Sequence, residues 1–141
     1  MKRVLLIDDN AADLELMGQA LAEIRIPAKV QTTNGAAQAF ALLRGCTHDA
    51  LPALIVLDLR MPVVDGMQTL RMLKQDAELS AIPVVMFSSS IRPAERAQCL
   101  QLGAIAYRVK PSVWPEYIEH ARAMARYLEG GCHFAPAGVT G

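Results

Sequence analysis

Three carboxylates, a hydroxyl and an ammonium stand at the ends of apolar segments of this chain. Asp8 and Asp9 follow the apolar run "RVLLI", and Asp58 directly follows "ALIVL". Ser88 and Lys110 end two later runs, "IPVVMFS" and "AIAYRVK". A carboxylate at the end of a buried strand loses hydration at a cost, so this placement indicates a chemical function.

These carboxylates would repel one another if they met at one edge of a sheet. At an effective dielectric constant of about 20, two charges about 4 Å apart repel by about 4 kcal/mol, and Lys110 offsets only part of that. A hard divalent cation would offset the rest, and an all-oxygen ligand set favours Mg²⁺ or Mn²⁺. A metal and an ammonium beside a carboxylate also suit a phosphoryl group, because they neutralise its oxygens while the carboxylate attacks phosphorus.

The segments that must bring these residues together alternate between strand and helix patterns. Short continuous apolar runs are typical of strands covered on both faces. We predict strands over residues 3–8, 28–33, 53–58, 82–88 and 104–109. Between and after them, apolar residues recur every three or four positions, which predicts five amphipathic helices. We expect the last helix to begin at Pro115, because the residue before a proline is disfavoured in helical geometry. This alternation predicts an α/β fold with one parallel sheet, whose strand ends share an edge.

The composition indicates one globular domain. The chain has 141 residues, is 52% hydrophobic and carries a formal net charge of zero, which does not suit binding to nucleic acid or to an anionic membrane. No apolar run approaches the roughly 20 residues of a membrane span. The three cysteines lack metal-binding spacing and favour a cytoplasmic protein with reduced thiols: Cys46, Cys99 and Cys132. We predict a domain over residues 1–129 and a flexible tail, rich in Gly, Ala and Pro, over residues 130–141.

The set of chemical residues resembles the receiver domain of bacterial response regulators, over about residues 2–128. The resemblance rests first on Asp8-Asp9, Asp58, Ser88 and Lys110-Pro111. It is extended by Met61-Pro62, Asp65-Gly66, Gly103-Ala104 and Tyr107. It implies a flavodoxin-like, doubly wound (βα)5 fold with five parallel strands in the order 2-1-3-4-5.

For the acidic residues, the resemblance implies a phosphorylated aspartate and a metal site. Asp58 would be the phosphoacceptor. Asp9 would bind Mg²⁺ directly and Asp8 mainly through water, while the backbone carbonyl of Arg60 would supply another ligand. The protein would catalyse only its own phosphorylation and dephosphorylation, and would not be an enzyme that acts on other substrates.

For the later strands, the resemblance implies a conformational switch. Ser88 would contact the phosphoryl group and shift toward it, and Lys110 would pair with a phosphoryl oxygen. Pro111 would follow Lys110 through a cis peptide bond. Tyr107 would swing inward as Ser88 shifts, so that phosphorylation favours a state already present.

Three segments are similar to those of the single-domain regulators that pair with phytochrome-type and other hybrid histidine kinases. They are "DDNAADLELM", "SSSIRPAERAQCLQLGAIAYRVKP" and the insert "RGCTHDALPAL". The similarity implies a sensor histidine kinase as partner. Output is expected through the fourth helix, fifth strand and fifth helix, where Trp114 and Tyr117 are aromatic residues of the kind enriched at interfaces. We expect this face to form a two-fold homodimer.

Other functions on the same fold remain as alternatives. A flavin-binding module needs a phosphate-binding loop after the first strand, where Asp8 and Asp9 would repel a phosphate. A Mg²⁺-dependent phosphatase places its nucleophile there with a second aspartate two residues later, and "Asp8-Asp9-Asn10" lacks that spacing. A receiver could also serve as a phosphorelay intermediate or as a scaffold that acts without phosphorylation.

Overall fold

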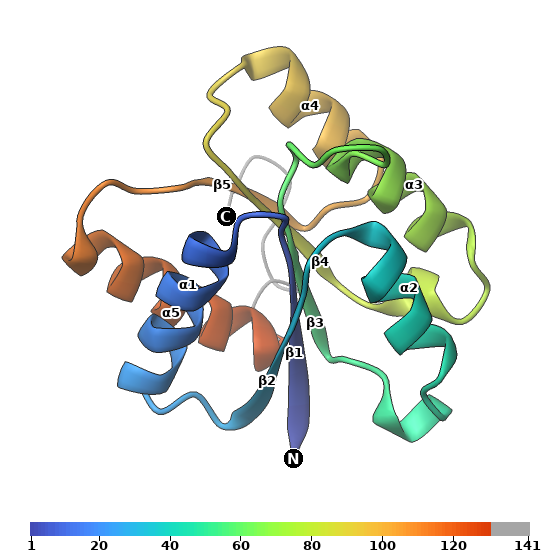
Figure 1. The fold of residues 1–141 in the computed structure, drawn as a ribbon, viewed down its shortest axis with the longest axis horizontal. Coiled ribbons are helices and arrows are strands. Elements are labelled where there is room, and N and C mark those ends of the chain that lie inside the picture. The colour runs from blue at the N-terminus through green and yellow to red at the C-terminus, as the bar shows by residue number, and fades with distance from the viewer. Residues whose placement is uncertain (131–141) are drawn as a thin grey trace.

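The five predicted strands form one parallel sheet in the order β2-β1-β3-β4-β5 (Figure 1), in a computed structural model that describes residues 1–130. The doubly wound α/β fold and its strand order are confirmed. The predicted strand ends agree with the structure to within two residues. The strands are β1 (Lys2–Ile7), β2 (Ala28–Thr33), β3 (Leu54–Leu57), β4 (Val84–Ser88) and β5 (Ala106–Val109).

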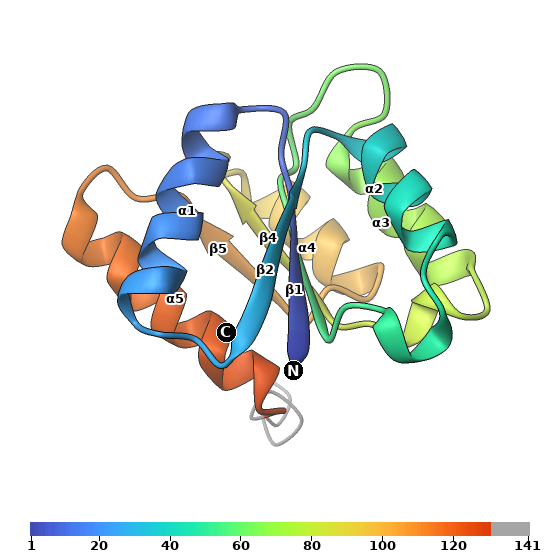
Figure 2. The same ribbon diagram turned by 60° about the horizontal axis from the view of Figure 1, so that its bottom comes forward.

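The helices cover both faces of the sheet. Helices α1 and α5 lie on one face, and α2, α3 and α4 lie on the other (Figures 1 and 2). They are α1 (Ala11–Glu23), α2 (Ala36–Arg44), α3 (Gly66–Gln75), α4 (Pro93–Gln101) and α5 (Trp114–Leu128). Two short 3-10 helices, η1 (His48–Ala50) and η2 (Leu79–Ala81), precede β3 and β4.

The sheet separates two apolar cores, because the side chains of each strand alternate between its faces. In β1, Val4 and Leu6 pack with α1 and α5, whereas Leu5 and Ile7 pack with residues of α2, α3 and α4. All four are at most 2% exposed. With both faces covered by apolar contacts, the ends of the strands are where polar side chains can gather.

Helix α5 begins at Trp114, so the predicted start at Pro115 is wrong by one residue. Val113 has the extended backbone of an N-cap residue, with φ of −129° and ψ of 149°. Pro115 is tolerated in the first turn because an N–H there would have no partner within the helix. The Trp114 ring also stacks on Tyr117, with ring centroids 6.3 Å apart, which favours a helical Trp114.

The loop between β3 and α3 contains a strained residue. Val63 has φ of 67°, a left-handed value that β-branched residues rarely adopt, and it is fully exposed. The Val64 N–H donates to the Pro62 carbonyl at 2.8 Å. This hydrogen bond between residues two apart closes a γ-turn around Val63 in its strained, positive-φ form.

We expect Val63→Gly to stabilise the protein by about 1 kcal/mol. Strain of this kind costs about 1–3 kcal/mol, and the greater freedom of glycine in the unfolded chain offsets part of the relief. Urea denaturation followed by circular dichroism would measure the difference. The control is Val109→Gly, which changes an exposed valine of β5 and should lose stability because strand geometry needs no positive φ. Equal losses in both variants would contradict the strain at Val63.

Within the described part of the chain, no helix has the length and apolar character needed to cross a membrane. The predicted flexible tail, residues 130–141, lies outside the described residues except for Gly130. Helix α5 ends at Leu128, and the predicted domain boundary at residue 129 stays a prediction.

Candidate functional site

The register of the sheet brings the three predicted carboxylates together. Ile7 of β1 is paired with Leu57 of β3, so Asp8 and Asp58 leave neighbouring strands at the same edge. Asp8 and Asp58 are 6% and 5% exposed, whereas Asp9 is exposed. One carboxylate oxygen of each lies within 4.8 Å of the others. We call Asp8, Asp9 and Asp58 the acidic cluster; their role as metal ligands stays a prediction.

Burial dominates the electrostatics of Asp58. Burial and the neighbouring Asp8 carboxylate raise the pKa of Asp58 to about 6, although Lys110 and a backbone hydrogen bond from Arg60 act in the opposite direction. The protein therefore leaves the ionised form of Asp58 short of positive charge. A hard divalent cation held by carboxylate oxygens would supply that charge, so the acidic cluster fits Mg²⁺ or Mn²⁺.

The Lys110 ammonium lies beside the acidic cluster. Its Nζ donates hydrogen bonds to Asp8 and Asp13, each at 2.7 Å, and lies 3.5 Å from Asp58 Oδ1. Burial lowers the pKa of Lys110, but the hydrogen bonds to Asp13 and Asp8 raise it by more, so the pKa lies above its ordinary value. Lys110 is therefore a partly buried, charged partner of the carboxylates.

Asp13 is a residue of this site that was not predicted from the sequence. An acid in the first turn of a helix is explained by the helix dipole alone, so its type and position gave no further reason to select it. In the structure, the Asn10 side chain caps α1 and accepts a hydrogen bond from the Asp13 N–H at 3.2 Å. Its position in the sequence could have indicated it, because Asp13 lies in the first turn of the helix that follows Asp8 and Asp9 and starts at the same sheet edge.

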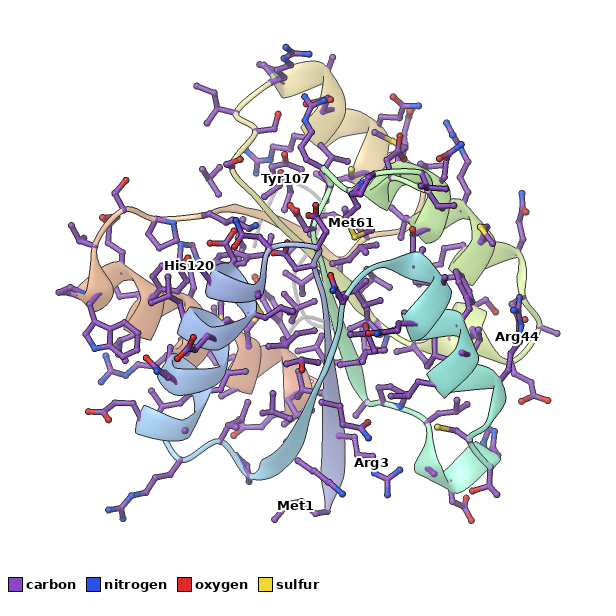
Figure 3. The ribbon with its side chains drawn as sticks, in the orientation of Figure 1. Met1, Arg3, Arg44, Met61, Tyr107 and His120 are labelled. Carbon is purple, nitrogen blue, oxygen red and sulfur yellow. The ribbon has the colours of Figure 1, made fainter. Side chains whose placement is uncertain are left out.

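The predicted switch residues lie on β4 and β5. Ser88 is fully buried, and its Oγ accepts a hydrogen bond from the Ser90 N–H at 3.2 Å. Tyr107 is 5% exposed, and its hydroxyl donates to the Ser90 carbonyl at 2.9 Å. Tyr107 therefore already lies in the inward position that we expected it to reach by swinging. It belongs to the same apolar core as Met61, and Figure 3 shows both near α4.

A side-chain network joins the loops beside the acidic cluster. The Arg60 guanidinium forms an ion pair with Glu95 of α4 at 3.0 Å, and the Ser90 hydroxyl donates to the same carboxylate oxygen. Tyr107 joins this network through the Ser90 carbonyl. A hollow of about 410 Å³ beside the acidic cluster is lined by residues that include Asp9, Arg60 and Glu95. Glu95 was not predicted as a site residue, and the role of the Arg60 carbonyl as a metal ligand stays a prediction.

The predicted cis peptide bond before Pro111 is wrong, because no peptide bond among the described residues is cis. The trans isomer of a bond that precedes proline is more stable by about 0.5–1 kcal/mol. With this isomer, the Lys110 N–H donates to the Ser88 carbonyl at 2.9 Å and its Nζ reaches Asp8. The contacts of Lys110 are thus satisfied with the more stable isomer.

The sequence pattern of the response regulator receiver domain family matches residues 4–122. The chain is 31% identical over 118 residues to the polar-differentiation response regulator DivK of Brucella anthropi, covering 84% of this chain and 91% of DivK. It is 36% identical to the response regulator Rre1 of Synechocystis over 108 residues, covering 77% of this chain and 45% of Rre1. It is also 36% identical to the phosphate regulon transcriptional regulatory protein PhoB of Rhizobium meliloti over 79 residues, covering 56% of this chain and 35% of PhoB. The chain thus spans less than half the length of the last two relatives.

Solved structures with the same fold include regulators named for phytochromes. The phosphorylated cyanobacterial phytochrome response regulator RcpA superposes with a TM-score of 0.81 at 31% identity, over 92% of this chain and 95% of RcpA. The Mn²⁺-bound response regulator Rcp1 gives a TM-score of 0.80 at 26% identity, over 92% and 96% of the two chains. The bacteriophytochrome response regulator AtBRR gives 0.73 at 30% identity, over 99% of each chain.

Proposed function

Because the chain belongs to the response regulator receiver domain family, we propose that it accepts a phosphoryl group from a histidine kinase onto Asp58, in a reaction that depends on Mg²⁺. The observation that carries the proposal is the buried Asp58 carboxylate, which lies within 4.8 Å of Asp8 and Asp9 and 3.5 Å from the Lys110 ammonium. A carboxylate kept short of positive charge in this way is suited to bind a cation and then to lose its own charge by forming an acyl phosphate.

In this reaction an Asp58 carboxylate oxygen attacks the phosphorus of the donor. The new O–P bond forms as the P–N bond of phosphohistidine, or the P–O bond of a small acyl phosphate, breaks and the donor leaves with the electron pair. Lys110 neutralises a phosphoryl oxygen, and the Ser88 hydroxyl donates to another. Mg²⁺ or Mn²⁺, held by the acidic cluster and the Arg60 carbonyl, would supply further charge neutralisation; Mn²⁺ is bound in the similar protein Rcp1.

The same arrangement supports an output surface on α4, β5 and α5. Tyr107 links β5 to the loop after β4 through Ser90. Arg108 links β5 to α5, because its Nε donates to His120 Nδ1 at 2.7 Å. Val113 and Trp114 leave exposed apolar area at the start of α5, 50% and 39% exposed. We infer that this face forms a two-fold homodimer. We also infer that the partner is a phytochrome-type or hybrid histidine kinase in the cytoplasm, because RcpA and AtBRR are named as phytochrome response regulators.

Removal of Mg²⁺ is expected to slow phosphorylation at least about a hundredfold. A metal supplies several kcal/mol of charge stabilisation to a phosphoryl transfer, and each 1.36 kcal/mol is about tenfold in rate. Acetyl phosphate would be added with Mg²⁺ or with EDTA, and the gain of one phosphoryl group followed by intact mass. Equal rates under both conditions would contradict the metal requirement, and no gain under either would contradict the proposed function.

The same samples test the dimer by sedimentation. We expect the phosphorylated protein, or the protein with beryllofluoride, to sediment as a dimer at tens of micromolar. A monomer with and without these additions would overturn the proposed homodimer and leave the phosphorylation chemistry standing.

A further inference from the structure

We propose that Asp13 is a positioning residue that holds the Lys110 ammonium away from Asp58 and so limits the rate of phosphoryl transfer. The inference rests on the proposed function and adds a residue that controls it. Asp13 is absent from the acidic cluster, whose ligand oxygens belong to Asp8, Asp9 and Asp58. It acts on the reaction through Lys110 alone.

The Lys110 ammonium donates its hydrogen bonds to Asp8 and Asp13 and not to Asp58. An ammonium has three N–H donors. Two of them are used at 2.7 Å, one by Asp8 Oδ2 and one by Asp13 Oδ2. Asp58 Oδ1 lies 3.5 Å from the same Nζ, which is an ion-pair distance without a hydrogen bond. The ammonium is thus bound more closely by Asp13 than by the carboxylate that reacts.

Burial makes this competition effective. The side chain of Lys110 is 10% exposed, and those of Asp13 and Asp58 are 23% and 6% exposed. Water therefore screens the Lys110–Asp13 pair only in part, and charge-assisted hydrogen bonds of this length are among the stronger ones. A phosphoryl oxygen on Asp58 would compete with Asp13 for the Lys110 ammonium, and a shift of Nζ toward Asp58 would weaken the bond to Asp13.

The charges around Lys110 favour the same direction. Its Nζ lies within 3.5 Å of carboxylate oxygens of Asp8, Asp13 and Asp58. Each carboxylate that binds Nζ weakens the attraction that the ammonium can offer to an anionic phosphoryl group. Removal of the Asp13 charge would leave Lys110 bonded to Asp8, with a donor released for the phosphoryl group.

The alternative is that Asp13 only stabilises helix α1 and has no effect on the reaction. It lies three residues after the N-cap residue Asn10, where an acid is favoured by the helix dipole. In that case Asp13→Asn would lower the stability of the fold slightly and leave the rate of phosphorylation unchanged. The two explanations therefore differ in a kinetic measurement.

The experiment compares Asp13→Asn with Glu15→Gln. Both changes remove one acid from α1, but Glu15 is exposed and its carboxylate bonds to Gln19. With acetyl phosphate and Mg²⁺, followed by intact mass, we expect Asp13→Asn to be phosphorylated about threefold to tenfold faster than the wild type. Glu15→Gln should match the wild type, and Asp13→Glu, which retains the carboxylate, should stay within about twofold of it.

A second arm tests whether the effect passes through Lys110. In a Lys110→Met background, which is itself expected to react slowly, Asp13→Asn should produce no acceleration. The chain has only four lysines, so the Nζ resonance of Lys110 can be followed directly in ¹⁵N-lysine spectra. It should shift in Asp13→Asn and not in Glu15→Gln.

The outcomes separate this inference from the proposed function. A wild type that gains no phosphoryl group overturns the proposed function and this inference with it. A wild type that is phosphorylated, with Asp13→Asn no faster, overturns only the role of Asp13. An acceleration that persists in Lys110→Met, or that Glu15→Gln reproduces, shows a general effect of charge and also overturns it.

Discussion

Replacement of Asp58 by asparagine is expected to abolish the mass gain from acetyl phosphate completely. The amide oxygen is a poor nucleophile, and no other carboxylate of the acidic cluster combines the burial of Asp58 with its position at the end of β3. Intact mass measured with Mg²⁺ would show a phosphoryl group in the wild type and none in Asp58→Asn. A gain that persists in the variant would place the acceptor on another residue.

The same substitution should stabilise the fold when Mg²⁺ is removed by EDTA. Burial and Asp8 raise the pKa of Asp58 from 3.8 to about 6, so the native state favours the protonated form. Native stability contributed by this group is present below about pH 4 and is lost as the pH rises through about 6. The loss is on the order of 3 kcal/mol for the ionised group, and asparagine avoids it.

Urea denaturation of both proteins in EDTA at pH 5 and pH 8 would measure this effect. The advantage of Asp58→Asn should be larger at pH 8. Asp49→Asn, which removes an exposed carboxylate from η1, is the control and should change the unfolding free energy by less than about 0.5 kcal/mol. An advantage of the same size at both pH values would contradict the raised pKa of Asp58.

Gly66→Ala should destabilise the protein by roughly 3 kcal/mol or more and also disturb the site. A Cβ on Gly66 would lie 2.0 Å from the Asp58 carbonyl oxygen and 2.6 Å from Leu59 Cα. These are backbone atoms that cannot rotate away, and the Gly66 N–H is itself bonded to the Leu59 carbonyl at 2.8 Å. The start of α3 would therefore be pushed away from the backbone of Asp58 and Leu59.

Gly18→Ala is the matched control for this substitution. Gly18 lies inside α1, and a Cβ there meets nothing within 4 Å. Alanine should stabilise that helix by up to about 1 kcal/mol. Chemical denaturation would compare the two variants, and the phosphorylation rate of any folded Gly66→Ala protein should fall at least about tenfold. Wild-type stability in Gly66→Ala would contradict the close approach of α3 to Asp58.

The sequence predicted the fold and the meeting of Asp8, Asp9, Asp58 and Lys110 for one physical reason. Parallel strands share an edge at their carboxyl ends, so residues that end strands must gather there whatever the details of packing. The register of β1 on β3 then places Asp8 beside Asp58. This part of the site depends on backbone topology, which periodic apolar patterns reveal.

The parts that the sequence did not reveal depend on side-chain geometry. The bond between Lys110 and Asp13 and the ion pair between Arg60 and Glu95 join residues far apart in the sequence, by rotamers that no local pattern encodes. The inward position of Tyr107 depends in the same way on the Ser90 carbonyl. The trans bond before Pro111 was missed because the family resemblance was carried over to a detail that this sequence does not determine.

The double use of Glu95 has an evolutionary consequence. One Glu95 carboxylate oxygen accepts hydrogen bonds from Arg60, which lies two residues after Asp58, and from the Ser90 hydroxyl. The Ser90 carbonyl accepts a hydrogen bond from Tyr107. A mutation of Glu95 would therefore change the position of Arg60 beside the site and, through Ser90, the contacts of Tyr107. Under the proposed function, a change at this position would alter the lifetime of the phosphoryl group and the strength of the output together, and evolution could separate the two properties only by first replacing one of the two contacts.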